Sequence, residues 1–163
     1  MGYTHYWVRD KRNVGSAWMF GNLALDAKKI IEQAKTEGIE ICGPLGKDQP
    51  EFTEAHFCFN GTEVGGLDHE TFWWEALPTQ PDYQYEYKRG SDRENEIFEF
   101  CKTAYKPYDL VVVAVLLRAK HWYGSVVDVF SDGGWDSDWK EGRDFYERIF
   151  GEVAQCPRDE VPA

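Results

Sequence analysis

The chain lacks any apolar run long enough to span a bilayer, the longest being the stretch from Leu110 to Leu117. No secretory signal precedes the four cysteines, and Cys42, Cys58, Cys101 and Cys156 include no close pair of the zinc or redox type. We therefore expect a soluble cytoplasmic protein with reduced thiols, no metal site and no cofactor.

Positive charge is also scarce. The 163 residues include 18 Lys and Arg against 29 Asp and Glu, which gives a formal net charge of −11. Such a charge repels phosphate backbones and anionic lipid at long range, so neither duplex nucleic acid nor a membrane is an expected partner. The excess acid either keeps the protein soluble or forms a surface that occupies the basic channel of another protein.

Diagnostic catalytic motifs are missing as well. There is no glycine pattern of the Walker or dinucleotide type, and His69-Glu70 lacks the second histidine of the zinc metalloproteases. Cys101 lies in an apolar strand-like run, which indicates a buried, inert thiol. Groups suited to acid, base or nucleophilic chemistry occur without informative spacing; they are His5, His69, Glu70, Lys102, Asp109 and Asp132. The sequence therefore favours a binding protein over an enzyme.

What the chain does contain is the composition of one globular domain. Hydrophobic residues make up 42% and charged residues 29%, so we expect a single α+β domain over 1–155 and a frayed tail over 156–163. Aromatic residues reach 16%, more than a core of this volume usually needs. We therefore expect some rings to be exposed for binding, and a homo-oligomer is consistent with the same excess.

Hydrophobic periodicity predicts the elements of a mixed or antiparallel sheet of five or six strands, packed by about three helices. The predicted strands cover 2–8, 39–42, 55–59, 70–74, 97–101 and 126–130, and the predicted helices cover 23–34, 107–122 and 139–153. Asn60-Gly61 suits a tight hairpin turn. The polar stretch 78–95 has no clear period, and we expect a lid there.

The segment 100–109 is the most suggestive for binding because it places basic and hydroxyl side chains at a strand-to-helix turn. A helix N-terminus offers free N–H groups and a positive dipole, so Lys102 and Lys106 are positioned to receive a phosphate or carboxylate. Asp109 lies in the same first turn and partly fills that role. A solvated turn that simply caps the helix is the equal alternative.

The N-terminal strand offers a second set of contacts. Tyr3, His5, Tyr6 and Trp7 would stack a base and bond its edges if they lined a cleft. Core packing is the competing interpretation; it is favoured for Trp7 and left open for His5. The turn 131–133, which includes Ser131 and Asp132, follows a predicted strand at a point where cleft edges often lie.

Five segments of the chain resemble a family of small, mostly uncharacterised phage-encoded and bacterial proteins. They are GYTHYW (2–7), FNG (59–61), HETF (69–72), FCKTAYKPYD (100–109) and SDG (131–133). The resemblance implies a shared site and a phage context, in which such proteins often counter host defences. The candidate ligand-binding residues are Tyr3, His5, Tyr6, Trp7, Asn60, Lys102, Thr103, Lys106, Tyr108, Asp109, Ser131 and Asp132.

Three functions are consistent with these observations. The first is a protein that binds and sequesters a small nucleotide-like ligand, such as a host defence signal. The second is an acidic inhibitor that blocks a nucleic-acid-binding host defence protein by direct contact. The third is an enzyme that acts on a nucleotide or modified base, with His5 and Asp132 as acid and base.

Overall fold

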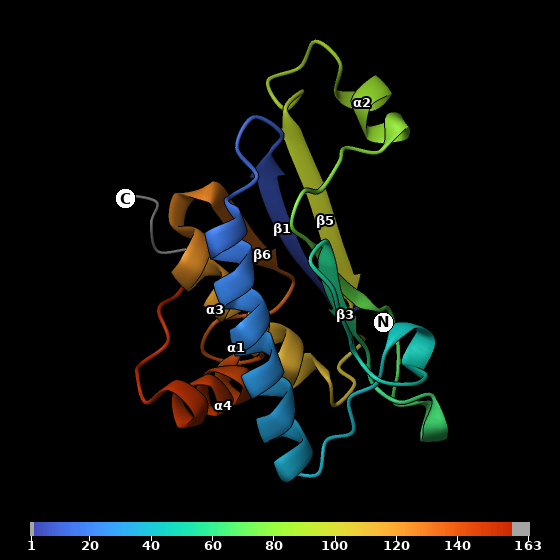
Figure 1. Cartoon of the computed structure of the whole chain (residues 1–163), viewed down its shortest axis with the longest axis vertical. Coiled ribbons are helices and arrows are strands. Elements are labelled where there is room, and N and C mark those ends of the chain that lie inside the picture. Colours follow the sequence, from blue (N-terminus) through green and yellow to red (C-terminus); the bar gives the residue numbers. More distant parts are fainter. Residues whose placement is uncertain (1, 158–163) are drawn as a thin grey trace.

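A computed structural model describes residues 2–157, which form one α+β domain with two antiparallel three-stranded sheets (Figure 1). The first sheet has β1 (Thr4–Asp10) at its centre, between β5 (Glu96–Lys102) and β6 (Val127–Ser131). The second sheet has the order β2-β3-β4, and its strands are β2 (Glu51–Phe52), β3 (His56–Phe59) and β4 (Phe72–Glu75). The predicted fold class is thus confirmed, with the strands divided between two sheets.

Three longer helices pack together on one side of the first sheet, and a short helix lies apart at one end of the molecule (Figure 1). The longer helices are α1 (Ala17–Thr36), α3 (Asp109–Tyr123) and α4 (Lys140–Phe150), and the short one is α2 (Asp82–Lys88). Single 3-10 turns occur at Pro44–Gly46, Val64–Gly66 and Gly124–Val126. None of the helices within 2–157 is long and apolar enough to cross a membrane.

The sequence periodicity explains which faces are buried. The side chains of Tyr3, just before β1, and of His5, Trp7 and Arg9 in β1 are all at most 1% exposed, because alternate residues of an extended chain share one face. The helix α3 is apolar all round, and every residue from 111 to 117 is buried between the first sheet and the other long helices. One core therefore continues from the helices through both sheets.

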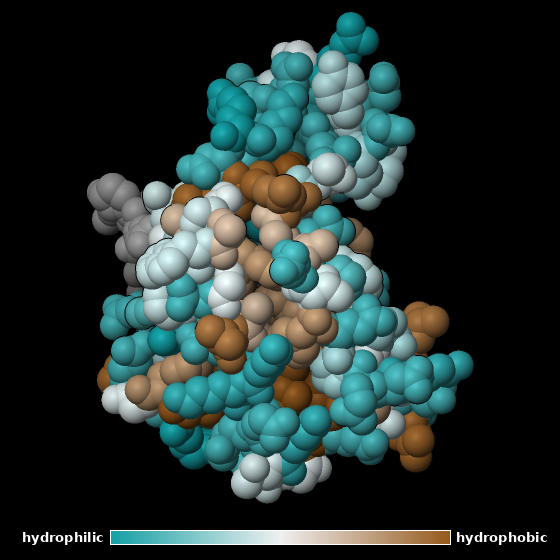
Figure 2. Space-filling model, in the orientation of Figure 1, coloured by the Kyte–Doolittle hydropathy of each residue, from teal (hydrophilic) through white to brown (hydrophobic). Residues whose placement is uncertain are grey.

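The surface that carries α1 is mostly hydrophilic (Figure 2). Hydrophilic residues cover the α2 end and much of the lower body, whereas hydrophobic residues gather in a band across the middle of this view. Part of the apolar surface beside α1 is a shallow hollow of about 690 Å³, lined among others by Phe20, Leu25 and Phe52.

The segment 39–42 was predicted as a strand, and this prediction is wrong. Only Cys42 pairs, through one isolated bridge to Asn60, because the turn that starts at Gly43 leads the chain away at once. The predicted tight turn at Asn60-Gly61 is also wrong, since a wide loop over 60–71 joins β3 to β4. Gly61 is needed there for close approach: a Cβ atom would lie 2.1 Å from the carbonyl oxygen of Leu67.

The polar stretch 78–95 contains the helix α2, which the sequence pattern did not predict. Pro107, expected in the first turn of the helix that follows β5, lies just before α3 begins at Asp109. Of the tail predicted to fray from 156 onward, Cys156 is half-buried and Pro157 is buried. The rest of that tail lies outside the described residues.

Candidate functional site

A buried histidine organises the polar cluster at one end of the first sheet. The side chain of His5 is fully buried, and its Nε2 lies 2.6 Å from Oδ1 of Asp109. The hydroxyl of Thr103 donates to the same carboxylate oxygen at 2.6 Å. On the other side of the ring, Nδ1 lies 2.9 Å from Oγ of Ser131. The cluster thus connects β1, the end of β6 and the start of α3.

Hydrogen bonds to the Ser131 hydroxyl set the donor and acceptor directions within this cluster. Its oxygen accepts from the indole Nε1 of Trp139 at 3.0 Å and from the backbone N–H of Gly133 at 2.9 Å. Both lone pairs are then used, so the hydroxyl proton donates to Nδ1 of His5 and the Nε2 proton points at Asp109. The result has the composition of a catalytic triad, but its hydroxyl has no lone pair free to attack a substrate. We interpret the cluster as a structural clamp.

Two tyrosines cover the clamp. Tyr3 is buried and its ring stacks on that of Tyr105 at a centroid distance of 4.0 Å, while Tyr105 itself is 59% exposed. Ala104 and Tyr105 both have positive φ angles, in a turn closed by the bond from Lys106 N to Thr103 O. Burial, and then the charge of Asp109, raise the pKa of the Tyr3 phenol.

A second polar network adjoins the first. The carboxylate of Glu70 accepts from the backbone N–H of Lys102 at 2.6 Å, and the hydroxyl of Tyr108 donates to the carbonyl of Glu70 at 2.6 Å. His69 Nδ1 lies 2.9 Å from the carbonyl oxygen of Lys102. The amide side chain of Asn60 bonds the backbone N–H and carbonyl of His69. The five segments that carry the resemblance therefore meet at one end of the first sheet.

At the expected anion site, most of the backbone N–H groups at the start of α3 are already hydrogen-bonded. The N–H groups of Lys106, Asp109, Leu110 and Val111 all have carbonyl acceptors within the preceding turn. These bonds, together with the inward-facing Asp109 carboxylate, take the place that a phosphate would need. The side chain of Lys102 instead lies against Gly2.

The remaining predicted residues divide between the core and the opposite face. Trp7 is in the core, as favoured, against Phe72 and Trp74. Asp132 bonds the backbone N–H of Thr4 at 3.0 Å and accepts from the Tyr6 hydroxyl at 3.0 Å. His5 therefore bonds Asp109 and Ser131, whereas Asp132 bonds Tyr6 on the outer face of the sheet. The two residues expected to act as acid and base, His5 and Asp132, do not bond each other.

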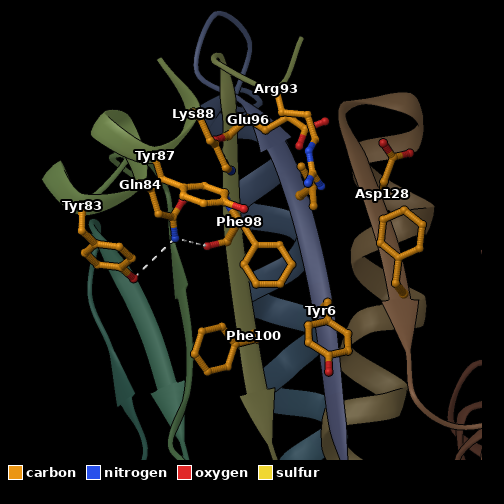
Figure 3. Close-up of a pocket in the computed structure, with 12 residues that line it drawn as sticks. Tyr6, Tyr83, Gln84, Tyr87, Lys88, Arg93, Glu96, Phe98, Phe100 and Asp128 are labelled. Carbon is orange, nitrogen blue, oxygen red and sulfur yellow. Dashed lines mark hydrogen bonds between the residues drawn. The ribbon is translucent and has the colours of Figure 1, made fainter. Parts of the chain in front are cut away.

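That outer face carries a groove lined by aromatic rings, with a volume of about 880 Å³ (Figure 3). The rings stand on all three strands of the first sheet, and two more come from α2 above it. They belong to Tyr6, Phe98, Phe100 and Phe130 on the strands and to Tyr83 and Tyr87 on α2. We call this hollow the aromatic groove. Of the predicted site residues, Tyr6 is the one that lines it.

The helix α2 is held over the groove by side chains that bond the free edge of β5. Gln84 donates to the carbonyl of Phe98 at 3.1 Å and accepts from its N–H at 3.4 Å. Lys88 Nζ and Gln80 Nε2 both donate to the carbonyl of Glu96, at 3.0 and 3.1 Å. These bonds protect an edge strand from pairing with other chains. They also fix the positions of the two tyrosines on α2.

Charges of both signs meet at the upper end of the groove. Arg93 points down toward the sheet, and Lys88, Glu96 and Asp128 lie around it (Figure 3). Burial lowers the pKa of Lys88. At the other end, burial and the hydrogen bond to Asp132 raise the pKa of Tyr6, so this phenol stays protonated and remains a donor. The groove is therefore nearly neutral within a strongly acidic protein.

Most of these groove residues were not predicted from the sequence, although the sequence contains a signal for them. In 96–102 the alternation places Ile97 and Cys101 on one face and Phe98 and Phe100 on the other. A strand that carries large rings on the face opposite its buried one is a candidate for binding. The segment 83–87 lies within the stretch 78–95, which was expected to form a lid, and two of its tyrosines line the groove.

No family model, curated protein or solved structure matches this chain.

Proposed function

We propose that the protein binds a small nucleotide-like ligand in the aromatic groove. One observation carries the proposal: four large rings are exposed together around one hollow. Tyr83 is 69% exposed, Tyr87 84%, and Phe100 and Phe130 49% each. Rings exposed as a group around a concavity mark a binding surface, whereas single exposed rings are ordinary.

The groove has the size and surface for a planar base. Its volume of about 880 Å³ lies within the range of roughly 300–1,000 Å³ that is usual for small-molecule sites. Phe98 forms part of the floor and stacks with Tyr6 at 5.6 Å, while the α2 tyrosines rise on one side. A base that enters between the floor and α2 gains stacking on flat rings, which contributes about 1–3 kcal/mol per base.

The charged end of the groove suits a single phosphate. Arg93 offers a planar fork of donors that matches phosphate oxygens, and Lys88 adds a second cation nearby. Glu96 and Asp128 line the same end, and the whole chain has a net charge of −11. A polyphosphate would meet repulsion there. We therefore propose a nucleoside monophosphate or a cyclic nucleotide as the ligand class.

The groove's side chains favour holding a ligand over converting it. Its lining consists of aromatic, aliphatic, amide and charged residues and includes no histidine, cysteine, serine or threonine. The amide of Gln84 and the ammonium of Lys88 are already bonded to the β5 backbone. Sequestration is thus the proposed role, and the resemblance to phage-encoded proteins supports a host defence signal as the captured molecule.

A calorimetric titration with adenosine and guanosine, their monophosphates and their cyclic forms tests the proposal. Tyr87→Ala should weaken binding by about 5- to 150-fold, which corresponds to the loss of about 1–3 kcal/mol of stacking. Tyr85→Ala is the matched control, because this tyrosine is on the same helix but outside the groove. It should bind as the wild type does.

A second pair of variants tests the phosphate contact. Arg93→Gln should weaken monophosphate binding and leave nucleoside binding unchanged, whereas Arg89→Gln, outside the groove, should alter neither. The proposal fails if no compound of the panel binds, or if Tyr87→Ala and Phe100→Ala both bind with wild-type affinity.

A further inference from the structure

The outer face of the second sheet brings together a carboxylate, an imidazole and a thiol. Glu51 on β2 lies directly opposite Cys58 on β3, and His56 lies two residues before Cys58 on the same face. Their ligand atoms all lie within 4.8 Å of one another. This cluster is on a different sheet from the aromatic groove and shares no residue with it.

Two of the three spacings, those that involve the Glu51 carboxylate, match the edges of a metal-centred tetrahedron. Nε2 of His56 lies 3.2 Å from Oε2 of Glu51, and Sγ of Cys58 lies 3.5 Å from the same oxygen. Around zinc, with Zn–S of about 2.3 Å and Zn–N and Zn–O of about 2.0–2.2 Å, tetrahedral angles require a nitrogen-oxygen edge of about 3.3 Å and a sulfur-oxygen edge of about 3.6 Å. Both observed distances agree with these edges.

We propose that Glu51, His56 and Cys58 form a zinc site on the outer face of the second sheet. A thiolate, an imidazole and a carboxylate together are borderline-soft ligands, which select zinc over magnesium or calcium. Three protein ligands leave the fourth tetrahedral position for water or a small ligand. The side chain of Glu51 is 47% exposed, which provides a path for the ion from solvent.

The imidazole is held in the orientation that a metal needs. Its Nδ1 lies 3.4 Å from the hydroxyl of Thr53, which also donates to the carbonyl of His56 at 3.2 Å. The ring stacks on Trp73 at a centroid distance of 4.3 Å and an interplanar angle of 17°. These contacts hold the plane of the ring so that Nε2 faces Glu51 at 3.2 Å.

A hydrogen-bonded trio without metal is the competing arrangement. There the thiol donates to Glu51, and a proton lies between Glu51 and His56. Zinc binds the thiolate form of cysteine, so an ion must displace the thiol proton of Cys58 on binding. Proton release on zinc addition therefore separates the two arrangements.

Chelator-treated protein, titrated with zinc chloride in a calorimeter, provides the direct test. We expect one zinc ion per chain and proton release that appears as a dependence of the heat on buffer ionisation. Cys58→Ser and His56→Gln should each weaken zinc binding by about tenfold or more. Cys156→Ser and His121→Gln, which change the same residue types outside the cluster, should bind as the wild type does.

Cobalt provides an independent readout of the ligand set. The wild type with Co²⁺ should show a thiolate charge-transfer band and the strong visible bands of a tetrahedral ion. The charge-transfer band should disappear in Cys58→Ser. If Cys58→Ser does not fold, as judged by circular dichroism, Glu51→Gln replaces it and should weaken cobalt binding while the thiolate band is kept. Absence of zinc binding by the wild type, or equal affinity in the variants, overturns the proposal.

Discussion

The buried arginine of β1 provides the sharpest test of how the two sheets are held together. Arg9 is 1% exposed, and its guanidinium donates to Oε1 of Glu99 at 2.9 Å and to the carbonyl of Glu75 at 3.0 Å. It also lies 4.5 Å above the ring of Trp74. The side chain thus connects β1 and β5 of the first sheet to β4 of the second. The substitution Arg9→Met removes the guanidinium and keeps most of the apolar stem.

The expected cost follows from what the substitution leaves behind. Removing one partner of a buried ion pair costs about 3–5 kcal/mol, because the other charge stays buried without compensation. Glu99 keeps 19% of its side chain exposed, so water relieves part of this penalty. We therefore expect a loss of about 3 kcal/mol at neutral pH. The double variant Arg9→Met/Glu99→Leu removes both charges and should recover about half of it or more.

The loss should depend on pH with a definite sign. Burial raises the pKa of Glu99, and Arg9 opposes that shift. A raised pKa means that the folded protein binds the Glu99 proton more tightly than the unfolded chain does. The stability that this gives is fully present below the ordinary carboxyl pKa and is lost as the pH rises through the raised pKa of the folded state. Without Arg9 the pKa of Glu99 rises further. The deficit of Arg9→Met should therefore be small in acid and grow toward neutral pH.

Urea unfolding, followed by tryptophan fluorescence at acidic and neutral pH, measures these differences. Equal slopes with denaturant concentration would show that the midpoint shift reports stability alone. A neutral-pH loss below about 1 kcal/mol would contradict the argument, because that is the scale of an ordinary surface change. So would a deficit that is the same at both pH values.

Three other predictions follow from single contacts. Thr103→Val removes the bond to Asp109 and should lower the free energy of unfolding by about 1–3 kcal/mol in a urea titration, because the carboxylate loses a buried donor. Zinc at about 100 times its dissociation constant should add about 2.7 kcal/mol and raise Tm by about 5–10 °C in a thermal melt, and Cys58→Ser should reduce this shift by about half or more at the same zinc concentration. Asp10 should titrate by NMR at about 2, because hydrogen bonds from Arg12 stabilise its carboxylate. Any stability that Asp10 contributes is present above its ordinary pKa and is lost as the pH falls through the lowered pKa of about 2.

Much of the fold could be predicted because its signals are local. The alternation in 2–8 predicts β1, and the helical stripe in 23–34 predicts α1, which begins after the Ser16 cap. The predictions are wrong where contacts with residues distant in the sequence determine the backbone conformation. Asn60-Gly61 has the composition of a hairpin turn, but contacts of Asn60 with His69 and of Gly61 with Leu67 impose a wide loop instead. The helix α2 has few aliphatic residues, so the sequence shows no hydrophobic stripe of helical period there.

The candidate sites were harder to predict because alternation reveals two faces of a strand but not which one is covered. His5 and Tyr6 are adjacent and both suit ligand binding, yet His5 faces the core and Tyr6 faces the groove. The proposed zinc ligands come from two paired strands, and only the register sets Glu51 opposite Cys58. A search for close cysteine pairs cannot find a site that contains one cysteine.

The two proposed sites share a physical logic that single-sequence reasoning can still use. In each sheet the inner face is constrained by packing, so Trp7 and Trp74 say little about function. The outer faces lack that constraint, and solvent alone would favour small or charged residues there. Phe100 and Phe130 on one outer face depart from this expectation, because both are 49% exposed. On the other outer face Glu51 and His56 lie against the buried thiol of Cys58. Core packing does not explain the two exposed rings or the Glu51–His56 pair, and binding is the explanation that the proposed titrations test.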